Sequence, residues 1–125
     1  RAAALAFAAT LLSLTPSAHA AWKVLAIVKA DKGLDREEVT VRSGRGFKRI
    51  KLKADAADVE IKSLHVVYGS GEPDKLEVRK VLRAGTETLP IDLKGGTRVI
   101  DRIVLWYATP ERETKKAIVT VYGND

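Results

Sequence analysis

The most basic stretch of the chain, residues 43–54 (SGRGFKRIKLKA), contains five basic side chains and no acidic one. This density of lysine and arginine is typical of a surface that contacts the phosphates of a nucleic acid or another polyanion. The same pattern also occurs on the exposed face of a strand, where each charge pairs with a charge on the neighbouring strand. The choice between the two interpretations depends on how this stretch pairs with its neighbours.

Two hairpins would give the basic stretch acidic partners. If residues 54–57 form a hairpin loop, Lys51 lies opposite Glu60, and if residues 43–46 form another, Lys51 also lies opposite Glu38. We therefore predict that Lys51 lies between two glutamates on an exposed sheet face. On the opposite face of the same strand, Ile50 and Leu52 point into the core. Four basic residues remain available to attract a polyanion such as a phosphorylated envelope glycan: Arg42, Arg45, Lys48 and Arg49.

The residues that could perform catalysis do not form a known motif. His65 is the only histidine after residue 20, and a serine hydrolase needs an imidazole oriented beside its nucleophile. Ser70 lacks the strand-to-helix elbow that exposes a nucleophilic serine. The glycine-rich segments 44–46 and 94–97 lack the frames of a dinucleotide fingerprint and a P-loop. We expect no catalytic residue and no cofactor, and we keep a small hydrolase that uses His65 or a carboxylate pair as a third hypothesis.

Metal binding has little support in the residue types. The chain has no cysteine, and one histidine after residue 20 is too few for the usual zinc sites. Two loops carry paired acids, Asp55 with Asp58 and Glu72 with Asp74. A weak calcium site is one interpretation of these pairs, and the capping of turns is the other. We expect no metal site.

A tryptophan shares one face of a predicted strand, residues 98–107, with two arginines. Alternation places Arg98, Arg102 and Trp106 on the same side. An exposed tryptophan beside arginine is suited to stacking against a sugar ring or to binding an anion. A tryptophan in the core is the alternative, which the usual burial of this residue type favours. We keep Arg98, Arg102 and Trp106 as candidate ligand-binding residues.

Alternation of apolar and polar residues with a period of two extends over most of the chain after residue 20, and no helical period is present. Turn sequences rich in glycine, proline and aspartate separate the apolar runs. The apolar runs are 22–28, Val39 and Val41, Ile50 and Leu52, Val59 and Ile61, Leu64, Val66 and Tyr68, Leu76 and Val78, Leu89, Ile91 and Leu93, 99–107, and Ala117, Val119 and Val121. We predict a single all-β domain over residues 21–125, an antiparallel β-sandwich or small barrel of about eight strands. Leu64 is out of phase with Ile61, which predicts a bulge or a break in the strand near residues 62–63.

The first 20 residues have the composition of a secretory signal peptide. A basic first residue precedes an apolar run over residues 2–14, a breaker at Pro16 and a small residue at Ala20. The run is shorter than the roughly 20 residues that span a bilayer. We therefore expect cleavage after Ala20 and a basic, cysteine-free protein in the bacterial periplasm or outside the cell, without a membrane anchor. An exported protein is not expected to meet nucleic acid.

Several segments resemble a family of small exported proteobacterial proteins that contain a domain of unknown function. The matching segments are 22–28, 47–52, 58–61, 84–85, Ile103 and 117–123. The resemblance covers most of residues 21–125 and rests on structural positions. It implies an exported all-β domain and supplies no catalytic signature.

Three functions follow as hypotheses. The first is a non-catalytic envelope domain that binds a ligand or a partner protein through its loops or one sheet face. The second is a binder of anionic glycans or other polyanions, with an affinity that falls steeply with salt. The third is the small hydrolase.

Overall fold

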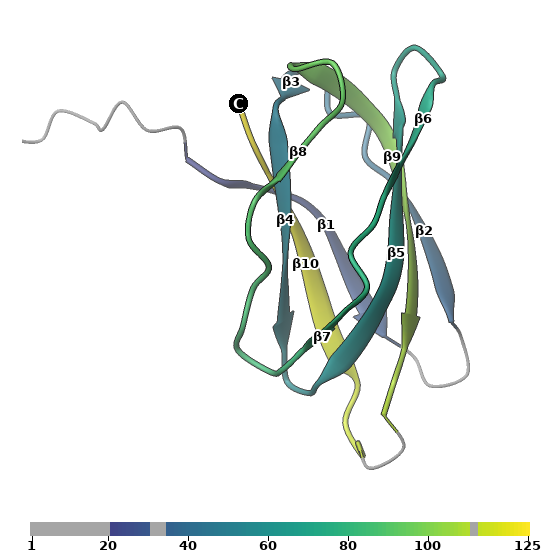
Figure 1. Ribbon diagram of the computed structural model, residues 1–125, viewed down its shortest axis with the longest axis vertical. Helices are drawn as coiled ribbons and strands as arrows, with labels where there is room; N and C mark the ends of the chain where they lie inside the picture. The colour runs from purple at the N-terminus through teal and green to yellow at the C-terminus, as the bar shows by residue number, and fades with distance from the viewer. Residues whose placement is uncertain (1–20, 31–34, 111–112) are drawn as a thin grey trace, which may run out of the picture.

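The computed structural model describes residues 21–30, 35–110 and 113–125 and shows a sandwich of two antiparallel sheets (Figure 1). The predicted signal peptide, residues 1–20, lies outside the described residues. The all-β prediction is confirmed: the described residues form ten strands and no helix. Accordingly, they contain no helix that could span a membrane.

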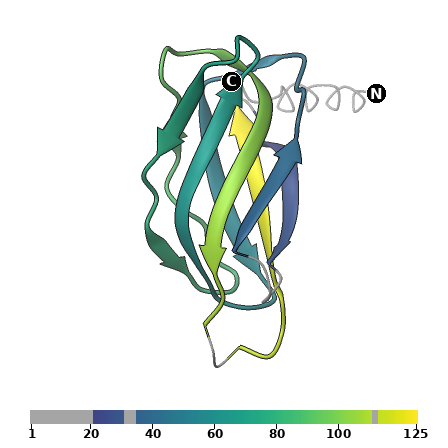
Figure 2. The same ribbon diagram turned by 90° about the vertical axis from the view of Figure 1, so that its right-hand side faces the viewer.

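The two sheets contain four and six strands. The four-stranded sheet has the order β1 (Lys23–Ala30), β10 (Ala117–Asn124), β4 (Arg49–Asp55) and β8 (Ile91–Asp92). The six-stranded sheet has the order β2 (Arg36–Thr40), β9 (Arg98–Ala108), β5 (Val59–Tyr68) and β6 (Pro73–Leu76), with β3 (Gly46–Phe47) paired to β9 and β7 (Lys80–Leu82) paired to β5. Figure 2 shows the six-stranded sheet in front, with the long strands β5 and β9 at its centre.

The core lies between the sheets and is built from the inward positions of each alternating strand. Ile50 and Leu52 of β4 are 0% exposed, so their predicted orientation is confirmed. The predicted bulge is also confirmed, because the register of β5 against β9 shifts between Ile61 and Ser63. The extra residue, Lys62, points outward, and both Ile61 and Leu64 are therefore buried.

The predicted hairpin between β4 and β5 is wrong, because the two strands belong to different sheets. The connecting segment passes from one sheet to the other, with Ala57 buried and Ala56 at a positive φ of 72°. Alternation fixes which side chains point inward, and this is the same whether two strands are neighbours or face each other across a core. The alternation pattern therefore could not distinguish the two arrangements.

The predicted hairpin at residues 43–46 is wrong for a similar reason. Strand β2 pairs with β9, where Val39 lies opposite Ile103. The chain then continues along β9, and the backbone N–H groups of Val41 and Arg42 both donate to the carbonyl of Asp101, at 2.8 and 2.9 Å. Consequently, neither Glu38 nor Glu60 lies beside Lys51.

Lys51 instead occupies a partly buried position with aromatic and acidic neighbours. It lies opposite Tyr122 on β10, and its Nζ is 3.0 Å from Oε1 of Glu87. Nζ is also 4.5 Å from the centroid of the Trp22 ring and 5.6 Å from that of Tyr122. Only 15% of the Lys51 side chain is exposed.

We expect Lys51→Glu to lower the free energy of unfolding by about 1–2 kcal/mol, because it removes the cation from the aromatic rings and places two acids together. Urea denaturation measures the effect. Lys48→Glu is the matched control, because Lys48 is exposed and has no ion-pair partner among the described residues. Equal losses for the two variants would contradict the packing described for Lys51.

Candidate functional site

The structure places the seven predicted ligand-binding residues at four sites. Trp106 and Arg102 lie on the outer face of the six-stranded sheet, and Arg98 lies at one end of the sandwich. Arg42 and Arg45 line one hollow. Lys48 and Arg49 lie together at the start of β4.

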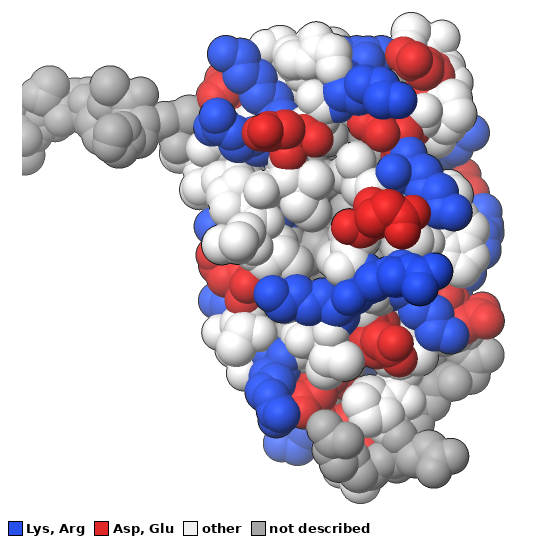
Figure 3. Space-filling model, in the orientation of Figure 1, with Lys and Arg blue, Asp and Glu red and all other residues white. Residues whose placement is uncertain are grey.

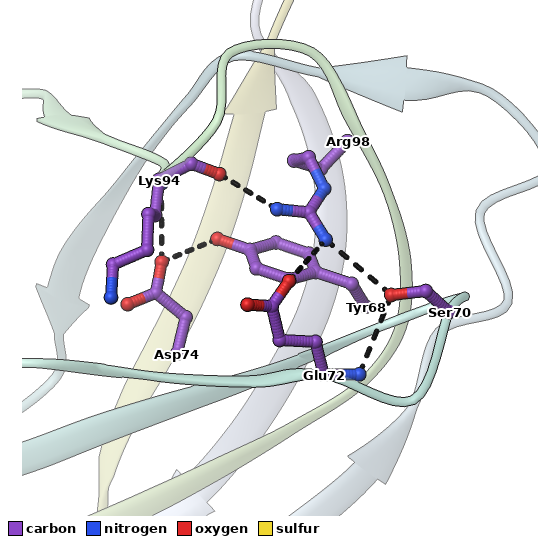
Figure 4. Close-up of polar contacts among 6 residues, drawn as sticks. All are labelled: Tyr68, Ser70, Glu72, Asp74, Lys94 and Arg98. Atoms are coloured by element: carbon purple, nitrogen blue, oxygen red, sulfur yellow. Dashed lines mark hydrogen bonds and ion pairs between the residues drawn. The ribbon is translucent and has the colours of Figure 1, made fainter.

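Arg98 belongs to a polar network between two loops (Figure 4). Its Cζ lies 3.9 Å from the centroid of the Tyr68 ring. The guanidinium donates to the carbonyl of Lys94 and to Oε1 of Glu72, each at 2.9 Å. These contacts join the turn after β5 to the loop before β9, and they give Arg98 partners within the protein.

The buried part of this network is the pair formed by Tyr68 and Asp74. Tyr68 is 1% exposed, and its hydroxyl donates to Oδ2 of Asp74 at 2.5 Å. Burial and the hydrogen bond to this carboxylate raise the pKa of the Tyr68 phenol well above its ordinary value. Asp74 is 6% exposed and also accepts the backbone N–H of Lys94 at 3.2 Å. The network therefore stabilises the end of the sandwich.

One acid of each loop pair, Asp58 and Asp74, accepts structural hydrogen bonds. Oδ1 of Asp58 accepts the backbone N–H of Ala84 at 2.9 Å, and Asp74 is held by Tyr68 and Lys94. Within residues 21–30, 35–110 and 113–125, no three histidine, aspartate or glutamate side chains gather in a way that could hold a metal ion.

Trp106 lies on the outer face of the six-stranded sheet. The expectation that it lies in the core, which its residue type favours, is therefore wrong. The inward positions of this part of β9 belong to Ile103, Leu105 and Tyr107, each at most 1% exposed. The alternation leaves Trp106 on the outside, partly exposed, between Arg36 on β2 and Ser63 on β5.

Two side chains pack directly against the Trp106 indole. The His65 ring lies 4.3 Å away between centroids, at an interplanar angle of 50°. The Cζ atom of Arg36 lies 5.4 Å from the centroid of the indole ring. Burial, followed by the positive charges of Lys75 and Arg36, lowers the pKa of His65 below 6.5, while Glu77 opposes the shift. The imidazole is therefore neutral at pH 7 and can both donate and accept a hydrogen bond.

A hollow of about 320 Å³ adjoins Trp106. We name its lining, together with Arg36, the Trp106 surface; the lining residues are Lys62, Ser63, His65, Lys75, Glu77, Arg79 and Trp106. The hollow has a simple origin in the strand pairing. Strand β6 pairs with β5 from Leu64 onward and β7 pairs with it up to Ile61, so residues 62–63 have no partner on that side.

The segment between β6 and β7 is strained at Arg79, which has a φ of 32°. A residue other than glycine in this conformation costs free energy and is held there by its surroundings. A second hollow, of about 340 Å³, shares Lys62 and Arg79 with the first and extends toward Lys80 and Val81. The two hollows therefore adjoin along the edge of the sheet.

The Trp106 surface and its extension have an excess of basic side chains. Lys62, Lys75 and Lys80 have no ion-pair partner in the described part of the chain. Arg79 and Glu77 approach within 3.8 Å, and both side chains are largely exposed. Figure 3 shows the adjacent side of the sandwich, where β6, β7 and β8 lie, with basic and acidic side chains interspersed. The unpaired lysines provide charge for an anionic group without making the whole face basic.

The remaining predicted residues are partly used by the protein itself. Arg102 Nε lies 3.3 Å from Oε2 of Glu38, and Arg49 Nε lies 3.0 Å from Oδ1 of Asp92. Arg45 pairs with Asp125 at 2.8 Å. The predicted group Arg42, Arg45, Lys48 and Arg49 therefore does not form one continuous unpaired stripe.

Sequence reasoning identified Trp106 and missed most of its neighbours as ligand-binding candidates. The sequence indicates only a catalytic role for His65, and it gives no sign that Arg36, Lys62 and Lys75 bind a ligand. His65 and Trp106 occupy outward positions of two long alternating strands, β5 and β9, and the pairing of these strands brings the two side chains together. That pairing joins distant parts of the sequence, so local patterns do not indicate it.

The structure defines a two-sheet antiparallel β-sandwich whose outer face carries an aromatic and basic surface. The chain belongs to the family described as Domain of unknown function (DUF2541), whose model matches residues 4–123. The resemblance of the sequence to a family with a domain of unknown function is thereby confirmed. Searches of curated proteins and of solved structures each gave no match.

Proposed function

We propose that this protein is an exported, non-catalytic domain that binds an anionic glycan of the bacterial envelope through the Trp106 surface. The observation that carries the proposal is the partly exposed Trp106 indole, which packs against His65 and Arg36 beside a hollow with unpaired lysines.

The chemistry of the surface suits a sugar ring that bears a negative charge. The apolar face of a sugar can stack on an indole, and Trp106 is held in one orientation by its two neighbours. The neutral imidazole of His65 and the hydroxyl of Ser63 can exchange hydrogen bonds with sugar hydroxyls. Lys62 and Lys75 can pair with a carboxylate or phosphate on the same ligand.

Export is part of the proposal and is supported by the sequence alone. The composition of residues 1–20 is that of a signal peptide, and the lack of cysteine is compatible with an oxidising compartment. Isolation of the native protein from a periplasmic fraction, with an N-terminus at Ala21, would support export, and retention of residues 2–20 would oppose it.

We expect Trp106→Ala to weaken binding of an acidic oligosaccharide by about 10-fold or more, because a tryptophan at the centre of a binding surface contributes strongly to affinity. Calorimetric titration with oligogalacturonate measures the effect, and its methyl-esterified form tests the need for charge. Trp22→Phe is the matched control, because Trp22 contacts Lys51 on the other sheet.

Three results would oppose the proposal. They are binding of Trp106→Ala with unchanged affinity, equal binding of the acidic and esterified sugars, and no binding of either sugar to the unmodified protein. Lys75→Ala and Lys48→Ala separate local from general charge effects, because only Lys75 lines the hollow. We expect the first of these variants alone to weaken binding of the acidic sugar.

A further inference from the structure

A third hollow, whose lining does not include Trp106, lies between the start of β1 and the segment that joins β2 to β3. Its volume is about 270 Å³. We name it the basic hollow, and its lining residues are Lys23, Val24, Leu25, Val41, Arg42, Ser43, Arg45 and Phe47. It shares no lining residue with the Trp106 surface.

The apolar part of this lining includes two closely packed side chains. The register of β1 against β10 shifts between Val24 and Ala26, and Leu25 lies at this irregularity. Leu25 and Phe47 both contact Gly123, where an added Cβ would lie 2.8 Å from Cδ1 of Leu25 and 2.9 Å from Cδ1 of Phe47. Phe47 is 2% exposed. The close packing holds Leu25 and Phe47 in place and leaves little room for either to collapse.

The polar part of the lining is basic. Lys23 and Arg42 have no ion-pair partner among the described residues, whereas Arg45 pairs with Asp125. The Cζ atom of Arg45 also lies 5.6 Å from the centroid of the Phe47 ring. Two unpaired cations and one paired cation therefore line a hollow that also has an apolar surface.

Arg42 is held in a strained conformation by the backbone around it. Its φ is 42°, a region that favours glycine. Its N–H donates to Asp101, and the next residue, Ser43, donates its N–H to the carbonyl of Ile100 at 2.9 Å. The Ser43 hydroxyl accepts the N–H of Ile100 at 3.1 Å and donates to the carbonyl of Arg45 at 2.7 Å. These hydrogen bonds fix the segment before any ligand arrives, which reduces the ordering that binding requires.

We propose that the basic hollow binds a small organic anion with an apolar body. The head group, a carboxylate or a phosphate monoester, pairs with Arg42 and Lys23, and the apolar body lies against Val24, which is 54% exposed, and Leu25. The volume is slightly below the roughly 300–1,000 Å³ of most small-molecule sites. The hollow therefore fits one head group with a short tail and is too small to enclose a polymer.

Arg42→Gly is the sharpest test, because glycine adopts the observed φ without strain and lacks the guanidinium. We expect this variant to be at least as stable as the unmodified protein and to bind hexanoate or hexyl phosphate about 10-fold more weakly or worse. Calorimetric titration measures the affinity, and thermal unfolding measures the stability. The two probes distinguish a carboxylate from a phosphate head group.

The controls address charge, the apolar body and the other site. Lys48→Ala removes a nearby exposed cation that does not line the hollow, and it should bind the probe as the unmodified protein does. Hexanol and inorganic phosphate lack the head group and the apolar body respectively, and each should bind more weakly than the amphiphilic anions. Trp106→Ala should retain the affinity, so that this inference and the proposed glycan function can fail separately.

The proposal is overturned if neither amphiphilic anion binds, if Arg42→Gly binds with unchanged affinity, or if Lys48→Ala loses as much affinity. Hexanol binding as tightly as hexanoate would remove the role of the cations. Inorganic phosphate binding as tightly as hexyl phosphate would remove the role of Val24 and Leu25.

Discussion

Ile50→Lys is expected to unfold the protein or to bring it close to unfolding. Ile50 is 0% exposed and lies in the core between the sheets. The substitution removes a buried apolar side chain and places an unpaired charge in its position, which costs about 4–5 kcal/mol or more. Total stabilities of domains are about 5–15 kcal/mol, so the loss is a large fraction of the total. Urea denaturation followed by circular dichroism measures it.

The neighbouring position on the same strand is the control. Arg49 is exposed and pairs with Asp92, and we expect Arg49→Ala to cost less than about 1 kcal/mol. A similar small loss for both variants would contradict the inward orientation of Ile50.

Tyr68→Phe is expected to lower the free energy of unfolding by about 2–3 kcal/mol at pH 7. The variant keeps the ring that Arg98 contacts and removes the hydroxyl that donates to the buried Asp74 carboxylate. A hydrogen bond to a charged group contributes about 1.5–3 kcal/mol, and the carboxylate would retain only the donor from Lys94. Tyr122→Phe is the matched control, because Tyr122 is partly exposed and its hydroxyl has no hydrogen-bond partner in the described part of the chain.

The loss of stability caused by Tyr68→Phe should depend on pH in a defined direction. The pKa of Tyr68 is raised in the folded protein, so the phenol keeps its proton there after it has lost it in the unfolded chain. The contribution of Tyr68 is therefore full below about pH 10, the ordinary pKa of tyrosine, and decreases as the pH rises above it. The stabilities of the unmodified protein and Tyr68→Phe should converge above pH 10. A constant difference from pH 7 to 11 would contradict the assigned shift.

The ion pairs of the basic stretch show which features the sequence could predict. Charge pairing was expected for Lys51, but with the wrong partners, and Arg45 and Arg49 were expected to have no partner. Arg45, Arg49 and Lys51 pair with acids from distant segments, Asp125, Asp92 and Glu87. Alternation reports which face of a strand a residue occupies, whereas its partners depend on which strands meet, and that is decided by packing of the whole core.

The bulge in β5 was predictable because it changes the phase of the alternation within one strand. Ile61 and Leu64 are both buried, which two residues of an uninterrupted strand at this spacing cannot be. The break between β6 and β7 leaves no such change in the alternation, because it depends on which parts of β5 these two edge strands pair with. The hollow beside Trp106 therefore could not be predicted, although Trp106 itself was a candidate from its residue type.

Only part of the lining of the basic hollow could be predicted from the sequence. Arg42 and Arg45 lie close together in a glycine-containing loop, and their charge made them candidates. Lys23 and Leu25 come from the first strand, and only the closure of the sandwich brings them to the same place. The strained backbone of Arg42 has no counterpart in the sequence, because arginine is not a residue that favours a positive φ.

The most direct test of the proposed function is to locate the bound glycan by NMR. Titration of the isotope-labelled protein with oligogalacturonate should shift the indole N–H of Trp106 and the amides of Lys62, Ser63 and His65, while the amides of Arg42 and Phe47 stay unchanged. Such a pattern would place the ligand on the outer face of the six-stranded sheet. Shifts confined to other surfaces, or no shifts at a saturating concentration of the sugar, would contradict the proposal that this face binds an anionic glycan.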